Sequence, residues 1–496
     1  EPSIGLCGQS CLVGSYIANI TDKDNTMLFN SFDFIFFFLI VGSITLLLNY
    51  THKLQARNAF LLLSSYIFYG SFNVCFLAIL LFATLVTYIG GLYLGKVSNK
   101  KLLTGIVVIL SLLPLVTFKY SYFLFHDVLR MSSSVSDWTA DLILPIGISF
   151  FTFQALTYTI DLYRGKVECC RNLVDYSLFV AFFPTVLSGP IEKARNLMPQ
   201  LKNTQCISLN DVMTGVGFFA WGLFKKIVVA DRLSQYVDWA YSSSEYVSGG
   251  TLALASVFYS IQIYCDFSGY SDMAIGIARC LGIRLSNNFS FPYFSTKIKD
   301  FWRKWHISLT SWFTEYVYFS LGGNRVKMKI RWIFNISMVF LLSGIWHGAA
   351  WNFLLWGIIH AVLYLSEYAV GLHKKGHCYK SLLQKTIAGC CVFLLVSLAW
   401  MFFRIEDLSK IFEVLSKIAS ASLFNIMPGA STVTFAINVL LLVLLGICEV
   451  FLYRNRENGD AVISRTPVVM CGWVCSLLLM IALFGQSNDS FVYFQF

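Results

Sequence analysis

The sequence predicts an all-α, polytopic membrane protein, and three observations support this fold class. Hydrophobic residues make up 57% of the 496 residues and charged residues only 13%, whereas soluble globular chains carry about 25% charged residues. The mean hydropathy is +0.66. Long apolar runs follow one another along most of the chain, with short polar loops between them. This composition disfavours a water-soluble enzyme, and it also disfavours disordered, collagen-like and coiled-coil chains.

The apolar runs are the expected transmembrane elements, taken in chain order. Several are shorter than the roughly 20 residues that a straight helical crossing needs. We therefore expect about 10–13 crossings, with re-entrant or interfacial helices besides them. Non-helical backbone at membrane depth is stable only inside protein or along a water-filled cavity, so the broken segments also indicate an internal site. The runs cover residues 32–49, 58–71, 74–95, 103–124, 142–161, 174–189, 211–230, 248–265, 267–283, 306–321, 332–346, 349–366, 386–403, 433–452 and 467–485.

Residues 1–26 differ in character from residues 27–496. The first segment has no long apolar run and contains Asp22, Lys23 and Asp24. It also lacks the basic start and the clean apolar run of a secretory signal. We therefore interpret it as an N-terminal extension of unknown role, followed by a transmembrane domain over residues 27–496.

The loops between the apolar runs explain the formal net charge of +10. Lys and Arg are enriched in loops that stay in the cytoplasm, and one such basic turn extends from Arg325 to Arg331. The loop at 126–142 is more polar and less basic, so we expect it on the outer side. No nucleic-acid-binding motif accompanies the charge, so no nucleic acid partner is expected. No metal site is expected either, because none of the 14 cysteines lies in a metal-ligand pattern.

The stretch from Trp332 to Ser366 contains no Lys, Arg, Asp or Glu. As one helix it would be about 50 Å long, against a hydrocarbon core of about 30 Å, so it must turn or break. The natural break is the segment 344–348, where two glycines flank His347. A polar residue at a glycine-lined break inside a membrane is a functional candidate. The alternative interpretation, which has equal weight, is that His347 is a neutral core histidine hydrogen-bonded to a backbone carbonyl.

His360 follows His347 by 13 residues. In a continuous helix this separation is about 20 Å along the axis and roughly 140° around it. The two histidines are therefore not expected to share a site, and we favour a structural or supporting role for His360.

The segment 284–325 mixes charged residues with tryptophans, which is typical of a membrane interface. His306 follows the charges and begins an apolar run, so it is the residue of this segment that can face an internal cavity. In the preceding stretch, Asp266 and Asp272 stand among apolar residues, and buried carboxylates are costly unless paired. A catalytic carboxylate pair is one interpretation. We favour structural pairing with a nearby arginine, namely Arg279, Arg284 or Arg303.

Taken together, these stretches resemble the membrane-bound O-acyltransferase (MBOAT) family, in its bacterial alginate O-acetyltransferase branch. The resemblance includes WHISL around His306 and GIWHG around His347. It extends over nearly all of residues 27–496, and its longest motifs lie at 27–39, 144–166, 182–191, 264–293, 300–325, 344–361 and 491–496. Residues 1–26 lie outside it.

The resemblance implies a ring of transmembrane helices around a central tunnel in a bacterial cytoplasmic (inner) membrane. It implies that His347 is catalytic, as the base that takes a hydroxyl proton, and that His306 orients the acceptor or polarises the thioester carbonyl. The implied donor is acetyl-CoA, for which Lys299, Arg303 and Lys304 are candidate contacts. The implied acceptor is an extracytoplasmic polysaccharide. Relatives of this branch commonly reach it through a partner with a periplasmic SGNH-hydrolase-like domain, so either such a partner is needed or the acceptor comes directly to the tunnel.

Two alternatives remain open at this stage. An MBOAT enzyme of the same pattern can carry D-alanine from a carrier protein to teichoic acid, because the two branches share motifs such as LGGNR at 321–325. The other alternative is a non-enzymatic transporter that uses only the polytopic bundle. The absence of an internal sequence repeat counts modestly against it.

Overall fold

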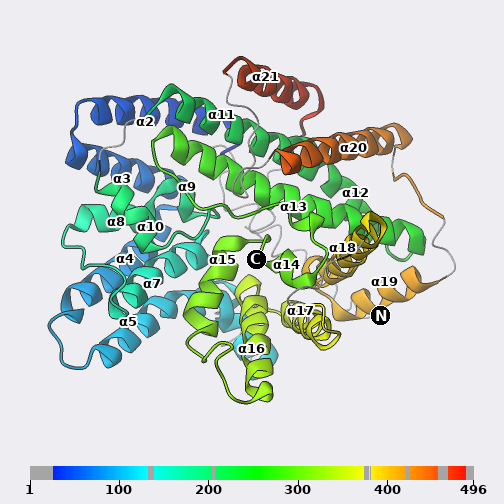
Figure 1. Ribbon diagram of the computed structural model, residues 1–496, viewed down its shortest axis with the longest axis horizontal. Coiled ribbons are helices and arrows are strands. Elements are labelled where there is room, and N and C mark those ends of the chain that lie inside the picture. The colour runs from blue at the N-terminus through cyan, green and yellow to red at the C-terminus, as the bar shows by residue number, and fades with distance from the viewer. Residues whose placement is uncertain are drawn as a thin grey trace, which may run out of the picture. The chain divides into compact units, whose positions relative to one another are not determined.

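The computed structural model describes residues 26–131, 139–203, 207–373, 379, 381–420, 425–429, 431–455 and 467–486. Within these ranges every regular element is a helix (Figure 1), which confirms the all-α fold class. The extension predicted over residues 1–26 lies outside the described residues except for Thr26, and so does the motif at 491–496.

The chain forms two compact units whose segments alternate along the sequence. Unit 1 consists of Glu1–Leu115, Ile143–Leu187 and Lys193–Cys206. Unit 2 consists of Val116–Leu142, Ser188–Glu192 and Ile207–Phe496. A single domain over residues 27–496 stays a prediction.

Helix α7 (Ile148–Tyr163) lies at the centre of unit 1, because nearly all its side chains are buried and both α4 and α5 pack against it. Its buried residues lie on every side of the helix and include polar ones such as Gln154 and Asp161. The other helices of unit 1 are α2 (Phe32–Tyr50), α3 (Leu54–Gly70), α4 (Val74–Leu94), α5 (Lys100–Leu115), α8 (Leu173–Ala181), α9 (Phe183–Val186) and α10 (Ala194–Leu201).

Helix α13 (Gly249–Cys280) is the central helix of unit 2, and it packs beside α11 along much of its length (Figure 1). The other elements of unit 2 are η1 (Val116–Tyr120), η2 (Phe123–Val128), α11 (Leu209–Leu223), η3 (Phe224–Ala230), α12 (Asp231–Ser242), η4 (Pro292–Phe294), α14 (Ile298–Trp302), α15 (Ile307–Trp312), η5 (Phe313–Tyr318), α16 (Lys329–His347), α17 (Trp351–Ala369), α18 (Leu382–Arg404), α19 (Leu408–Ala419), α20 (Thr432–Arg454) and α21 (Pro467–Phe484).

The two separate spans expected at 248–265 and 267–283 form this one helix of 32 residues. The glycines of α13 do not interrupt the helix. They allow the backbone of α11 to approach it closely. A Cβ at Gly269 would lie 2.7 Å from the carbonyl oxygen of Gly222, and one at Gly276 would lie 2.4 Å from that of Gly215. Close backbone packing of this kind is a common use of glycine in membrane helices.

In the described part of the chain, seven helical segments are long and apolar enough to cross a membrane. Large apolar side chains on them point outward, for example Leu47, Val74 and Val433, as expected for a surface that faces lipid. The protein is therefore a multi-pass membrane protein, while the full number of crossings stays a prediction. The seven segments are Phe32–Tyr50, Val74–Leu94, Lys100–Tyr120, Leu209–Ser242, Lys329–His347, Leu382–Arg404 and Thr432–Arg454.

Several helices continue into wider π-helical turns. Helix α11 passes through η3 into α12 within one helical segment, and η5 continues α15. Such turns re-aim the side chains that they carry and occur frequently at functional sites. Both η1 and η3 carry lysines, namely Lys119, Lys225 and Lys226.

Candidate active site

The site is built around the end of α16, where the helix stops at His347 and the chain reverses into α17. Gly348 has extended backbone, with φ −163° and ψ 152°, and so ends the helix. A Cβ on Gly348 would lie 2.1 Å from the ring of Phe353, so a larger residue here would require this ring to move. The break predicted between Trp332 and Ser366 is confirmed.

Two further glycines bring α16 and α17 together after the break. A Cβ on Gly344 would lie 2.4 Å from the carbonyl oxygen of Phe353, and one on Gly357 would lie 2.6 Å from that of Phe340. The helices therefore pack with their backbones in close contact, and they lie side by side in Figure 1. The resulting hairpin folds α17 back along the last turns of α16.

This reversal changes the position expected for His360. Its ring packs edge-to-face on Trp356 with the centroids 4.8 Å apart, and the ring of His347 packs on the same indole at 5.1 Å. The prediction that helical geometry separates the two histidines by about 20 Å is wrong, because the helix breaks at Gly348. Both ring nitrogens of His360 are buried, and neither has a hydrogen-bond partner among the described residues.

The second predicted histidine, His306, lies in the turn between α14 and α15. Its backbone is left-handed, with φ 42° and ψ 56°. Asn288 holds this turn, because its carbonyl oxygen accepts from Ile307 N at 2.8 Å and its side-chain oxygen accepts from Ser308 Oγ at 2.7 Å. The His306 ring then packs edge-to-face on Phe267 of α13, with the centroids 4.6 Å apart.

The structure thus brings together the two histidines that the sequence singled out. The ring centroids of His306 and His347 lie 6.4 Å apart, and the residues are only 1% and 4% exposed. Trp346 contacts both rings, at 5.7 and 4.8 Å, and Phe403 lies 5.1 Å from His347. Two imidazoles in aromatic surroundings can accept and return a proton while water is excluded.

Asp266 and Asp272 form ion pairs, but not with the predicted arginines. Lys226 Nζ lies 2.7 Å from Asp266 Oδ1 and 2.8 Å from Asp231 Oδ1. Lys225 Nζ lies 2.6 Å from Asp272 Oδ2. Both lysines belong to η3, which packs against α13, so the wider turns aim the two ammonium groups at the carboxylates. The predicted pairing is confirmed, and the predicted partners are wrong.

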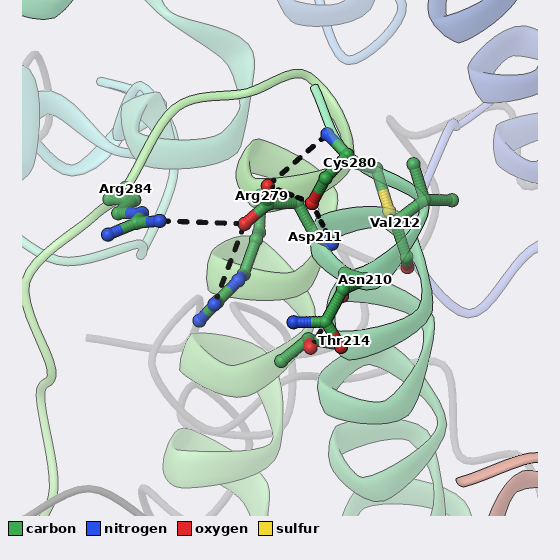
Figure 2. A network of polar contacts seen from close by, with 8 residues as sticks. Asn210, Asp211, Val212, Thr214, Arg279, Cys280 and Arg284 are labelled. Atoms are coloured by element: carbon green, nitrogen blue, oxygen red, sulfur yellow. Dashed lines mark hydrogen bonds and ion pairs between the residues drawn. The ribbon is translucent and has the colours of Figure 1, made fainter. Parts of the chain in front are cut away.

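The arginines considered for that role contact other carboxylates. Arg279 Nη2 and Arg284 Nη2 lie 3.7 and 3.6 Å from Asp211 Oδ1, as Figure 2 shows, and Arg303 Nη1 lies 3.9 Å from Asp300 Oδ1. Asp211 occupies the first turn of α11 and Arg279 the last turn of α13. Charges of these signs at these helix ends are favourable, so the cluster ties the two central helices together.

The predicted donor contacts lie on α14 and in the turn that leads to His306. The side chain of Arg303 is 73% exposed, and Lys299 and Lys304 are half-buried. Glu367 of α17 accepts hydrogen bonds from the backbone nitrogens of Ile298 and Lys299. The basic segment is thereby anchored to α17, and its contact with a donor stays a prediction.

The residues that follow α17 strengthen this anchor. Nε2 of His373 lies 2.7 Å from Oε1 of Glu367, and Lys297 Nζ donates to the carbonyl oxygen of Leu372 at 2.8 Å. Burial lowers the pKa of His373, and the neighbouring Glu367 carboxylate opposes this shift. The end of α17 and the start of α14 therefore form one cross-linked polar cluster.

Three lysines near these helices were not selected from the sequence. Lys119 lies within the apolar run at 103–124, and Lys225 and Lys226 lie within the run at 211–230. A charged residue inside an apolar span is by itself a signal of function or of a buried partner. The position of these lysines inside apolar runs is visible in the sequence, although it does not identify the groups that they contact.

Comparison with known proteins shows which family the chain matches. The family model described as "MBOAT, membrane-bound O-acyltransferase family" matches residues 61–405, a range that includes both histidines and the donor candidates.

Individual relatives extend the match to most of the chain. A probable alginate O-acetylase of Pseudomonas syringae is 35% identical over 461 residues, covering 89% of this chain and 86% of that protein. A peptidoglycan O-acetyltransferase of Helicobacter pylori is 32% identical, over 94% of this chain and 90% of that protein. A teichoic acid D-alanyltransferase of Bacillus subtilis is 29% identical, over 66% of this chain and 85% of that protein.

Proposed function

Because the chain belongs to the membrane-bound O-acyltransferase family, we propose that it moves an acetyl group from acetyl-CoA in the cytoplasm across the membrane, toward a hydroxyl of an extracytoplasmic polysaccharide. The observation that carries this proposal is the buried pair of His306 and His347, with ring centroids 6.4 Å apart. Acyl transfer from a thioester to a hydroxyl requires a base at the point of reaction, and neutral imidazole suits this role near pH 7.

His347 acts as that base in the proposed reaction. It takes the proton of the attacking hydroxyl while the hydroxyl oxygen bonds to the thioester carbonyl carbon. The C–S bond then breaks, and the leaving thiolate takes the proton back from the imidazolium. His306 orients the hydroxyl or polarises the carbonyl, and the aromatic side chains around both rings exclude water that would otherwise hydrolyse the thioester.

The donor enters from the side of the basic segment. Lys299, Arg303 and Lys304 supply positive charge next to the turn that carries His306, and Arg303 is exposed enough to meet an anionic nucleotide. With the basic loops in the cytoplasm, this arrangement belongs to a bacterial cytoplasmic membrane. Only the acetyl group has to cross, since the nucleotide stays at the surface.

The acceptor side is assigned by likeness to the relatives. Their names specify alginate and peptidoglycan, so a cell-envelope or exported polysaccharide is the proposed final acceptor. We assign delivery to a partner with an extracytoplasmic SGNH-hydrolase-like domain, which accepts the acetyl group on a hydroxyl and passes it to the glycan.

The test follows labelled acetyl from acetyl-CoA to the acceptor with purified protein and its partner. His347→Ala should lower the rate by about 10²–10⁴-fold, while the amount of inserted protein stays close to that of the wild type. His126→Ala is the matched control, because His126 is an exposed histidine on η2, and it should retain the wild-type rate. Near-normal turnover in His347→Ala would contradict the assigned role of this residue.

D-alanyl transfer to teichoic acid is the second candidate, and the match to a teichoic acid D-alanyltransferase favours it. The same histidine pair serves both reactions, because each moves an acyl group from a thioester to a hydroxyl. The donors distinguish them. Release of free thiol from acetyl-CoA supports acetyl transfer, and release from a D-alanyl carrier protein alone supports the alternative.

A further inference from the structure

The π-helical turn η1 places a lysine at the end of the helix that carries His347. Lys119 Nζ donates to the carbonyl oxygen of Trp346 at 2.7 Å and to that of His347 at 3.1 Å. The next residue, Tyr120, donates from its hydroxyl to the carbonyl oxygen of Ile345 at 2.9 Å. Two consecutive residues of η1 thus bind three consecutive carbonyls at the end of α16.

These contacts satisfy groups that a helix leaves open. The last four carbonyls of a helix have no partner within it, and its C-terminal end carries a partial negative charge that a cation stabilises. A buried ammonium is costly unless it is hydrogen-bonded. The Lys119 ammonium therefore provides donors for the open carbonyls of α16, and these carbonyls offset the cost of burying the ammonium.

Lys119 also contacts the aromatic residue that lies against both histidines. Its Nζ lies 5.8 Å from the ring centroid of Trp346, in the range of a cation–π interaction. The same indole contacts His306 at 5.7 Å and His347 at 4.8 Å. The ammonium therefore restrains both the backbone of His347 and the side chain next to its ring.

We propose that Lys119 is a positioning residue for His347: its ammonium fixes the C-terminal turn of α16, and thereby the imidazole, in the geometry needed for acyl transfer. The expected effect on the reaction rate rests on the proposed function. A base displaced by about 1 Å loses roughly 10²-fold in rate without any loss of substrate binding. Lys119 itself touches neither donor nor acceptor in this role.

Steady-state kinetics test the proposal with Lys119→Met, which keeps the length of the side chain and removes the charge. We expect kcat to fall about 10–100-fold, with KM for acetyl-CoA changed less than about twofold and a normal amount of inserted protein. Lys119→Arg should restore kcat to within about threefold of the wild type, because a guanidinium can also donate to two carbonyls. Lys101→Met, at the exposed opposite end of the same apolar segment, is the matched control and should behave as the wild type.

A double-mutant cycle separates positioning from a general structural role. If Lys119 acts through His347, Lys119→Met should change the residual rate of a His347→Ala protein by less than about twofold. An equal loss in both backgrounds would overturn the proposal.

A second readout does not depend on the reaction. The rate of His347 modification by diethyl pyrocarbonate, followed by mass spectrometry, should rise at least about threefold in Lys119→Met, because the helix end loosens. It should return toward the wild-type rate in Lys119→Arg. An unchanged modification rate in Lys119→Met would overturn the positioning role even if acyl transfer itself proved not to be the function of the protein.

Discussion

His306 combines a candidate catalytic ring with a backbone that few side chains adopt. Its φ of 42° and ψ of 56° lie in the left-handed region, which costs a residue with a Cβ about 1–2 kcal/mol. Strain of this kind persists only where the surroundings enforce it, and it clusters at functional sites. The hydrogen bonds from Ile307 and Ser308 to Asn288 supply that enforcement.

This backbone distinguishes two substitutions that remove the same ring. His306→Gly relieves the left-handed strain, whereas His306→Ala keeps it. We expect both proteins to lose acyl transfer to a similar extent. His306→Gly should unfold at a temperature about 1 °C higher than His306→Ala, as about 1 kcal/mol implies for a chain of 496 residues. Thermal unfolding in detergent and acetyl transfer measure the two effects. An equal or lower midpoint for His306→Gly would contradict the strain.

At the scale of single residues, the sequence pointed to His347 at the break of an uncharged run and to His306 at the start of an apolar run, and the family resemblance favoured both. The sequence was not sufficient to place His360, since the straight-helix estimate does not apply once the chain reverses at Gly348. Roles for the selected residues stay proposals, and the experiments above decide them.

At the scale of elements, the close contact of α16 and α17 sets the position of His347. Gly344→Ala would place a Cβ 2.4 Å from the carbonyl oxygen of Phe353, and backbone on that side cannot rotate away as a flexible side chain can. We expect the hairpin to shift and acetyl transfer to fall at least about tenfold. Gly446→Ala in α20 is the control, because a Cβ there meets nothing within 4 Å. Wild-type activity in Gly344→Ala would show that the rings tolerate a shift of the hairpin.

The ion pairs between η3 and α13 lead to a second prediction for the elements. The Lys225 side chain is 3% exposed and that of Asp272 is 18% exposed. Removing one member of this pair therefore leaves a largely uncompensated charge, at a cost below the roughly 3–5 kcal/mol of a fully buried pair. Lys225→Met and Asp272→Asn should therefore each reduce the amount of folded protein. The double variant should fold better than either single variant, because neither member of the pair is then left without its partner. Size-exclusion profiles of the three proteins measure this, and additive losses would argue against the pairing.

The break between α16 and α17 was predictable because it follows from length alone: an uncharged run that exceeds the membrane thickness has to turn. The continuity of α13 was not predictable, because Gly269 and Gly276 are equally compatible with a break and with a close neighbour. The partners of Asp266 and Asp272 were not predictable either. Which cation reaches them depends on η3, whose wider turns have no clear sequence pattern.

At the scale of the whole molecule, α16 links the basic turn to the candidate site. It begins at Lys329 and ends at His347, which is about 27 Å of helix against a hydrocarbon core about 30 Å thick. His347 therefore lies at the opposite end of α16 from the basic turn. In the proposed reaction, the path of the acetyl group leads to His347, and the proposed donor contacts lie beside His306.

The orientation of the chain is the remaining prediction, because this path has a direction only if the basic turn is in the cytoplasm. The positive-inside rule places Lys329 inside and the loop that contains Met131 outside, and both residues are exposed on the protein. In a cysteine-depleted background that retains activity, a membrane-impermeant maleimide added to intact cells should label Met131→Cys and leave Lys329→Cys unlabelled. Permeabilised cells should show both sites labelled, which establishes that each thiol is reactive. Labelling of Lys329→Cys from outside would reverse the orientation, and it would place the donor on the opposite side of the membrane from the one proposed.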